Sequence, residues 1–172
     1  MSWTPLLRLT VASSLLACLC IAGIAATPAP ASAFGMSGFG AKLGYLTPEN
    51  LDGTMAISGH LEFAQPASRL HLIPSVMFWN SNNLSDVSAN ADLYYHFAPE
   101  GLMTPYVGAG LGVNFFNHDG SDQSATKLGA NFFGGLRLPA AGFHYFVEGR
   151  YTASDISQFG VMGGITFHSG SH

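Results

Sequence analysis

The sequence predicts an all-β protein, a closed antiparallel eight-stranded transmembrane β-barrel. Only 9% of its 172 residues are charged, against roughly 25% in soluble domains, so charge cannot readily cover a water-exposed surface. No apolar run is long enough for a helical membrane bundle, whose helices need about 20 apolar residues each. Apolar residues instead alternate with small or polar ones at a period of two, which is the period of a β-strand.

The N-terminal segment, residues 1–33, is typical of a secretory signal peptide, which leaves residues 34–172 as the outer-membrane barrel domain. Arg8 supplies the positive charge, residues 9–26 contain the apolar stretch, and residues 31–33 form an A-x-A cleavage site. A membrane anchor is the alternative, but the segment is short and rich in small residues. We therefore expect export and cleavage.

Cysteine positions and charge pattern exclude several kinds of chemistry. Both cysteines, Cys18 and Cys20, lie before the predicted cleavage site, so the mature chain has no thiol for a disulfide, a zinc site or a nucleophile. The sequence has no phosphate-cradling motif and no basic patch, so we expect no cofactor and no nucleic acid partner.

Eight segments follow the period of two, and most are near the 9–11 residues that a tilted strand needs to cross a bilayer. The segment 104–116, TPYVGAGLGVNFF, shows the alternation most clearly, with apolar residues at odd positions and mainly glycine at even positions. One exception is Pro74, which lacks a backbone donor in mid-strand, so we expect a β-bulge there. The predicted strands are 38–46, 54–64, 69–79, 87–97, 104–116, 125–138, 143–152 and 156–168.

Charges within these segments all fall on the face opposite the apolar one. A lipid-facing band must exclude them, because a cation at the bilayer midplane costs about 2–4 kcal/mol. Backbone groups in lipid must also be paired, which requires closure into a barrel. A soluble lipocalin-like barrel with the apolar residues inward is the alternative, but its outer surface would be poor in charge and prone to aggregate. The predicted lumen charges are Lys42, Glu62, Asp92, Lys127, Arg137, Glu148 and Arg150.

An eight-stranded barrel has an interior just wide enough to be filled by side chains. The lumen charges are therefore expected to pair as a salt-bridged plug, with an ion gate or narrow channel as the alternative. Four histidines share the inward face near the periplasmic ends of their strands, and strand order pairs them as His71 with His96 and His144 with His168. Solvated rim residues are one interpretation of this set; a metal site or a pH sensor is the other, and the spacing fixes no coordination geometry.

Connections at the predicted outer end are acidic and contain no lysine or arginine. Such a rim could attract divalent cations and so contact lipopolysaccharide, or it could simply be solvated. The loop 117–122 contains His, Asp and Ser, but a loop alone does not orient a nucleophile and its base, so we do not expect an enzyme. The acidic residues assigned to the outer loops are Glu49, Asp52, Asp86, Asp119, Asp122 and Asp155.

Several segments resemble the small outer-membrane β-barrel proteins of the OmpA-type and opacity-like group. They are TPYVGAGLGVNFF (104–116), LGANFFGGLRL (128–138), FVEGRY (146–151), GGITF (163–167) and the hairpin GFGAKLGYLTPENLDGTM (38–55). The resemblance implies a barrel in the outer membrane of a Gram-negative-type bacterium, inserted by the barrel-assembly machinery. A role in envelope integrity or surface interaction is expected, with lipid and lipopolysaccharide as partners of a monomer. A porin-like narrow channel is the alternative, and a lipid A-modifying enzyme comes third.

Overall fold

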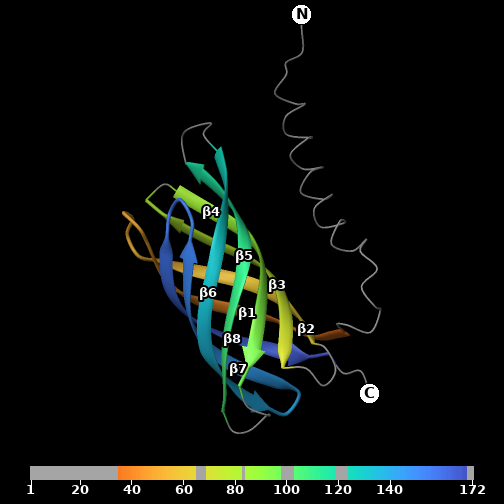
Figure 1. Cartoon of the computed structure of the whole chain (residues 1–172). Helices are drawn as coiled ribbons and strands as arrows, with labels where there is room; N and C mark the ends of the chain where they lie inside the picture. Colours follow the sequence, from red (N-terminus) through yellow and green to blue (C-terminus); the bar gives the residue numbers. More distant parts are fainter. Residues whose placement is uncertain (1–34, 65–68, 83, 98–102, 119–123, 170–172) are drawn as a thin grey trace, which may run out of the picture. The chain divides into compact units, whose positions relative to one another are not determined.

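The computed structural model describes residues 35–64, 69–82, 84–97, 103–118 and 124–169, and the predicted signal peptide lies outside them. No helix in this part of the chain is long and apolar enough to cross a membrane. The described residues form eight β-strands (Figure 1). These are β1 (Gly35–Pro48), β2 (Thr54–Ala64), β3 (Leu70–Ser81), β4 (Leu84–His96), β5 (Thr104–His118), β6 (Ser124–Ala140), β7 (Phe143–Ala153) and β8 (Gln158–His168).

The eight strands form a closed barrel in which each strand pairs antiparallel with the next. β8 returns to β1, with a register that runs from His168 opposite Gly38 to Gln158 opposite Pro48. Closure gives every strand two hydrogen-bonded neighbours and removes the sheet edge. The predicted fold class is confirmed. We call the end where β1 begins and β8 ends the terminal end, and the opposite end the far end.

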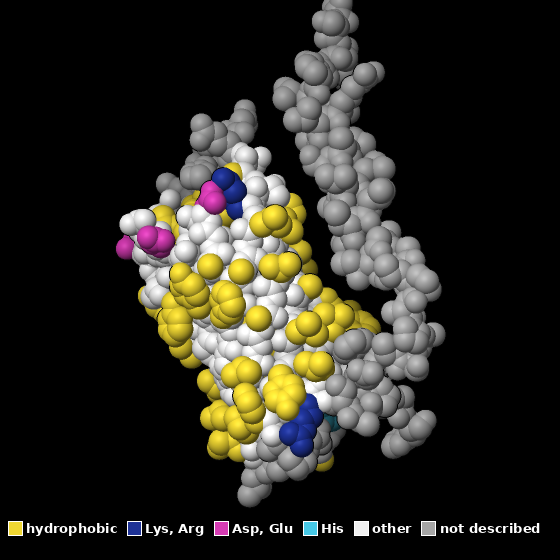
Figure 2. Space-filling model, in the orientation of Figure 1, with side chains coloured by type: hydrophobic (Ala, Val, Ile, Leu, Met, Phe, Trp, Pro, Cys, Tyr) yellow, Lys and Arg dark blue, Asp and Glu magenta, His cyan; other side chains and the backbone are white. Residues whose placement is uncertain are grey.

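Side chains alternate between the interior and the outer surface along each strand. In β4 every second residue from Asp86 to His96 is buried, and the residues between them are exposed. Outward residues along the middle of the strands are apolar, and Leu111 and Leu128 are 71% and 79% exposed. Figure 2 shows the result on one face, where apolar side chains span the middle and charged ones lie near the two ends. The soluble barrel with an apolar interior and a polar surface is thereby excluded.

Strands at the far end run further than the sequence predicts. Residues 80–86, predicted as an outer loop, are mostly strand, because β3 continues to Ser81 and β4 starts at Leu84. Both side chains are buried, so the alternation of interior and outer residues continues through them. The turn between them uses Asn82 at a φ of 50°, a left-handed conformation that asparagine adopts more readily than most residues. Asp86 therefore lies in β4, and its assignment to a loop is wrong.

The β-bulge predicted at Pro74 is not found. The register of β2 with β3 is the same on both sides of Pro74, and Pro74 itself pairs in register with Ala91 of β4. The missing N–H interrupts the ladder to β2 without adding a residue to the strand. A register shift occurs instead between Met36 and Gly38 of β1.

Glycines of β5 make room for large side chains in the interior. A Cβ atom on Gly108 would collide with the ring of Phe133, which lies directly opposite on β6. A Cβ atom on Gly110 would collide with the carboxylate of Asp92. The nearly bare inner face of this strand thus admits the ring and the carboxylate that fill the middle of the lumen.

Candidate functional site

The centre of the barrel interior is organised around the carboxylate of Glu148, which is fully buried. Its Oε1 accepts hydrogen bonds from Lys42 Nζ at 3.1 Å and from Arg150 Nε at 3.0 Å. Its Oε2 accepts from the hydroxyls of Tyr94 at 2.7 Å and Tyr106 at 3.2 Å. These donors come from β1, β4, β5 and β7, so one carboxylate ties four strands together across the lumen.

Arg150 extends this network to a second carboxylate. Its Nη2 donates to Asp92 Oδ2 at 2.7 Å, and its guanidinium lies 4.6 Å from the centroid of the Phe133 ring, a cation–π distance. Asp92 also accepts from Asn131 Nδ2 at 3.1 Å, and Asn131 Oδ1 accepts from Thr152. The central charges are therefore paired and hydrogen-bonded on both sides, as buried ions require. We call Lys42, Asp92, Glu148 and Arg150 the central charge cluster.

A second group of ionisable residues lies nearer the terminal end, around Glu62. Its Oε1 lies 2.6 Å from His71 Nδ1 and 3.4 Å from Arg137 Nη1. Its Oε2 lies 3.7 Å from His144 Nε2. Compared with the contacts of Arg150, those of Arg137 are long for a charge-assisted hydrogen bond, which is typically about 2.7–2.9 Å.

The histidines paired by strand order do lie together. The rings of His71 and His96 are 4.4 Å apart between centroids, and His144 Nδ1 lies 3.0 Å from His168 Nε2. In the part of the chain that the structure describes, no three His, Cys, Asp or Glu residues are arranged to hold a metal ion. A further histidine, His60, is buried on the inward face of β2. It was not predicted as part of the set, although the alternation of residues in β2 places it on that face.

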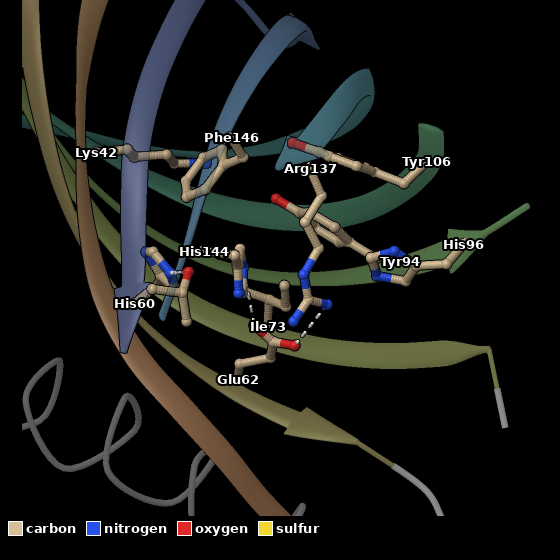
Figure 3. A pocket seen from close by; sticks show the side chains of 11 residues that line it. Lys42, His60, Glu62, Ile73, Tyr94, His96, Tyr106, Arg137, His144 and Phe146 are labelled. Carbon is tan, nitrogen blue, oxygen red and sulfur yellow. Dashed lines mark hydrogen bonds and ion pairs between the residues drawn. The ribbon is translucent and has the colours of Figure 1, made fainter. Parts of the chain in front are cut away.

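A small cavity lies between the central charge cluster and the residues around Glu62. Figure 3 shows Arg137 and His144 directed toward Glu62 within it, with the imidazole of His60 nearby. The residues that line it are Lys42, His60, Glu62, Ile73, Tyr94, His96, Tyr106, Arg137, His144, Phe146 and Thr166.

The far half of the interior contains a cluster of buried apolar side chains, packed among buried polar ones such as Ser88 and Asn114. Trp79 and Met162 have no exposed surface, and Leu46 is 1% exposed. Leu84 and Phe116 belong to the same buried cluster. The interior is therefore asymmetric, with an apolar plug at the far end and a polar cavity toward the terminal end.

The structure brings together six of the seven predicted lumen charges, in two groups. The seventh, Lys127, lies near the far end, where its ammonium pairs with the carboxylate of Asp155. Among the predicted acidic loop residues, Glu49, Asp52 and Asp155 are exposed at the far end. Asp86 is fully buried beside Trp79, its partner in register on β3. Asp119 and Asp122, like most of the loop considered for catalysis, lie outside the described residues.

Comparison with known proteins supports the fold. No protein-family model matches the chain, and a search of curated proteins finds no significant match. The crystal structure of Neisserial surface protein A (NspA) is similar, with a TM-score of 0.59, 15% identity, and coverage of 77% of this chain and 95% of that one. The N-terminal β-barrel domain of Pseudomonas aeruginosa OprF gives a TM-score of 0.60 at 17% identity, covering 78% and 99%. The chain has the fold of the small eight-stranded outer-membrane barrels.

Proposed function

We propose that this chain is an integral outer-membrane β-barrel that acts as a sealed structural element of the envelope. The continuous apolar surface around the middle of the strands supports a place in a bilayer, since such a surface in water would aggregate. The fold shared with small outer-membrane barrels supports the same location. Export by a cleaved signal peptide and insertion by the barrel-assembly machinery belong to this proposal.

The observation that carries the structural role is the filled lumen. A pore needs a continuous hydrated path, whereas here the central charge cluster spans the interior with its charges bonded to one another. Beyond it, Trp79, Met162 and Leu46 close the far half. Ions would have to break buried ion pairs and then pass an apolar plug.

A narrow channel gated by the lumen charges is the second candidate. It is favoured by the cavity, which reaches Lys42 and so contacts the central charge cluster from the terminal end. Conductance in a planar bilayer separates the two candidates, because a plug blocks current and a gated channel passes it in steps. An enzyme is the third candidate; comparing the mass of lipid A with and without the protein tests it.

Lipid and lipopolysaccharide are the proposed partners of a monomeric barrel. The exposed carboxylates of Glu49 and Asp52 at the far end support cation-bridged contact with anionic headgroups. Calcium or magnesium is then expected to raise the thermal stability of the refolded barrel or its binding of lipopolysaccharide. If neither cation changes either property, the cation-bridged contact is wrong.

The test of the structural role is deletion of the gene in its host. We expect the protein in the outer-membrane fraction of the parent, and we expect the deletion to admit a hydrophobic dye faster than the parent does. Expression of the wild-type chain should restore the barrier. An unchanged dye permeability in the deletion, or a protein found outside the outer-membrane fraction, would overturn the proposal.

A further inference from the structure

One ring nitrogen of His168, the last residue of β8, is approached by two donors. Arg137 Nη2 on β6 lies 3.4 Å from His168 Nε2, and His144 Nδ1 on β7 lies 3.0 Å from the same atom. A guanidinium only donates hydrogen bonds, so His168 Nε2 must be unprotonated in order to accept one. Neutral His168 then carries its proton on Nδ1. The contact with Arg137 therefore fixes the tautomer of His168.

The tautomer of His144 follows from the same contacts. Because His168 Nε2 accepts, His144 Nδ1 carries the proton and donates it, which leaves His144 Nε2 unprotonated in the neutral ring. That nitrogen lies 3.7 Å from Glu62 Oε2. A bare imidazole nitrogen and a carboxylate oxygen are both acceptors, so they form no hydrogen bond. The contact between His144 and Glu62 is thus unsatisfied while both rings are neutral.

One added proton rearranges the three contacts. With a proton on Nε2, His168 becomes the donor to His144 Nδ1, so His144 must carry its own proton on Nε2 instead. His144 Nε2 then donates to Glu62 Oε2, and the unsatisfied contact becomes a hydrogen bond. The N–H groups of Arg137 and His168 now oppose each other, so Arg137 keeps only its contact with Glu62 Oε1. The net change is the uptake of one proton from solvent.

His168 is the member of this group that solvent reaches. Its side chain is exposed, whereas His144 and Glu62 are buried. Imidazole is the side chain that ordinarily exchanges its proton with solvent between about pH 5 and 8. The backbone N–H of His168 donates to the carbonyl of Gly142 at 3.0 Å, which keeps the ring in place beside Arg137. The rearrangement is therefore confined to side chains.

The surrounding charges leave Glu62 Oε2 free for His144. His71 Nδ1 lies 2.6 Å from Glu62 Oε1, on the other side of the carboxylate. The neighbour of His168 in register on β1 is Gly38, which has no side chain to titrate. The titratable and charged groups that the other inner faces present in this half of the barrel are Lys42 on β1, His60 and Glu62 on β2, His71 on β3, Tyr94 and His96 on β4, Tyr106 on β5, Arg137 on β6 and His144 on β7.

We propose that His168 is a proton sensor at the terminal end of the barrel. Protonation of its Nε2 reverses the tautomer of His144 and leaves Arg137 with Glu62 alone. A contact between β6 and β8 is thereby exchanged for one between β7 and β2. The ion pairs of the central charge cluster include none of these residues, so they stay formed. This switch goes beyond the sealed structural role and does not depend on it.

The test is nitrogen-15 NMR of the full barrel refolded in detergent micelles with labelled histidine rings, at about pH 8 and about pH 5. Protonated and unprotonated ring nitrogens have distinct shifts. In the wild type we expect His144 to carry its proton on Nδ1 at the higher pH and on Nε2 at the lower pH. His168→Phe removes the acceptor, so His144 should carry its proton on Nε2 at both. The matched control is His96→Phe, because the ring of His96 packs against His71 instead. It should behave as the wild type does.

Three results overturn the proposal. The first is an unchanged tautomer of His144 in the wild type, and the second is protonation of both His144 nitrogens at the lower pH. The third is a reversal in His168→Phe like that of the wild type. If His168→Phe does not refold, the wild-type spectra decide alone, because the first two results need no variant. Dye permeability of the deletion strain is independent of these spectra, so the structural role and the proton sensor can fail separately.

Discussion

Arg150 and Glu148 lie two residues apart on the inner face of β7, and Arg150 Nε donates a 3.0 Å hydrogen bond to Glu148 Oε1. Residues at this separation in a strand share a face, so the local sequence FVEGRY already aligns the pair. Lys42 from β1 and Asp92 from β4 complete the central charge cluster from strands distant in sequence. The two residues are thus aligned by their own strand, and their ion pairs connect that strand with β1 and β4 across the interior.

Replacement of Glu148 by glutamine should destabilise the barrel strongly. The change leaves the ammonium of Lys42 without its ion pair and removes one of the two carboxylates around Arg150. Breaking a buried ion pair costs about 3–5 kcal/mol, to be measured by urea unfolding of the refolded barrel in lipid vesicles. Glu49→Gln, at an exposed turn, should leave the free energy of unfolding unchanged. Equal stability of the two variants would contradict the role of the cluster.

Removing the charge of the buried Asp86 carboxylate should not destabilise the barrel, unlike removing the charge of Glu148. Asp86 forms no ion pair with the described residues and lies beside Trp79 in the far half of the interior. Asp86→Asn keeps the shape and removes a charge that is costly to bury, so the free energy of unfolding near neutral pH should stay level or rise. Asp92→Asn removes a partner of Arg150 and should lower it. A large loss of stability in Asp86→Asn would show that a cation or donor engages it.

Position 108 should require glycine, because any side chain there would collide with Phe133. Gly108→Val would drive its side chain into the Phe133 ring, and overpacking of this kind typically costs about 1–3 kcal/mol. The matched control is Gly59→Val on the outer face of β2, where a Cβ atom meets nothing within 4 Å. Comparison of the two unfolding midpoints in urea checks this. A Gly108→Val barrel as stable as Gly59→Val would mean that Phe133 does not lie against β5.

An arginine on the outer face should destabilise the barrel in lipid vesicles, because this face contacts the bilayer. Leu111 is 71% exposed in the middle of β5, and an arginine at the bilayer midplane costs about 2–4 kcal/mol. Leu111→Arg should lower the free energy of unfolding from lipid vesicles by this amount. Asp52→Arg, at an exposed position between β1 and β2, should change it little. Equal effects at the two positions would argue against a membrane-facing surface.

The alternation of residues predicted the fold and the inward placement of the charges, because burial in a barrel follows strand parity directly. The alternation could not predict which charged side chains form ion pairs. Lys127 lies on the inward face of its strand, but it is close to the far end of the barrel and therefore pairs with Asp155 there. The alternation together with the strand order correctly predicted that His71 lies beside His96.

Strand ends were less predictable than strand faces. The polar residues 80–86 favour a loop by composition, but Ser81 and Leu84 continue the inward set and extend the hairpin. β8 was expected from residue 156 and begins at Gln158. The apolar plug was hidden for a different reason, since Leu46, Trp79 and Met162 lie far apart in the sequence and meet only when β8 closes on β1.

The most direct test of a sealed lumen is the conductance of the refolded wild-type barrel in a planar lipid bilayer, recorded in concentrated potassium chloride on a membrane shown to contain the protein. The account predicts no conductance steps above those of the protein-free bilayer, because the central charge cluster and the apolar plug fill the interior. Reproducible single-channel steps from the wild-type protein, altered in size or frequency by Arg150→Gln, would contradict it and establish the gated channel.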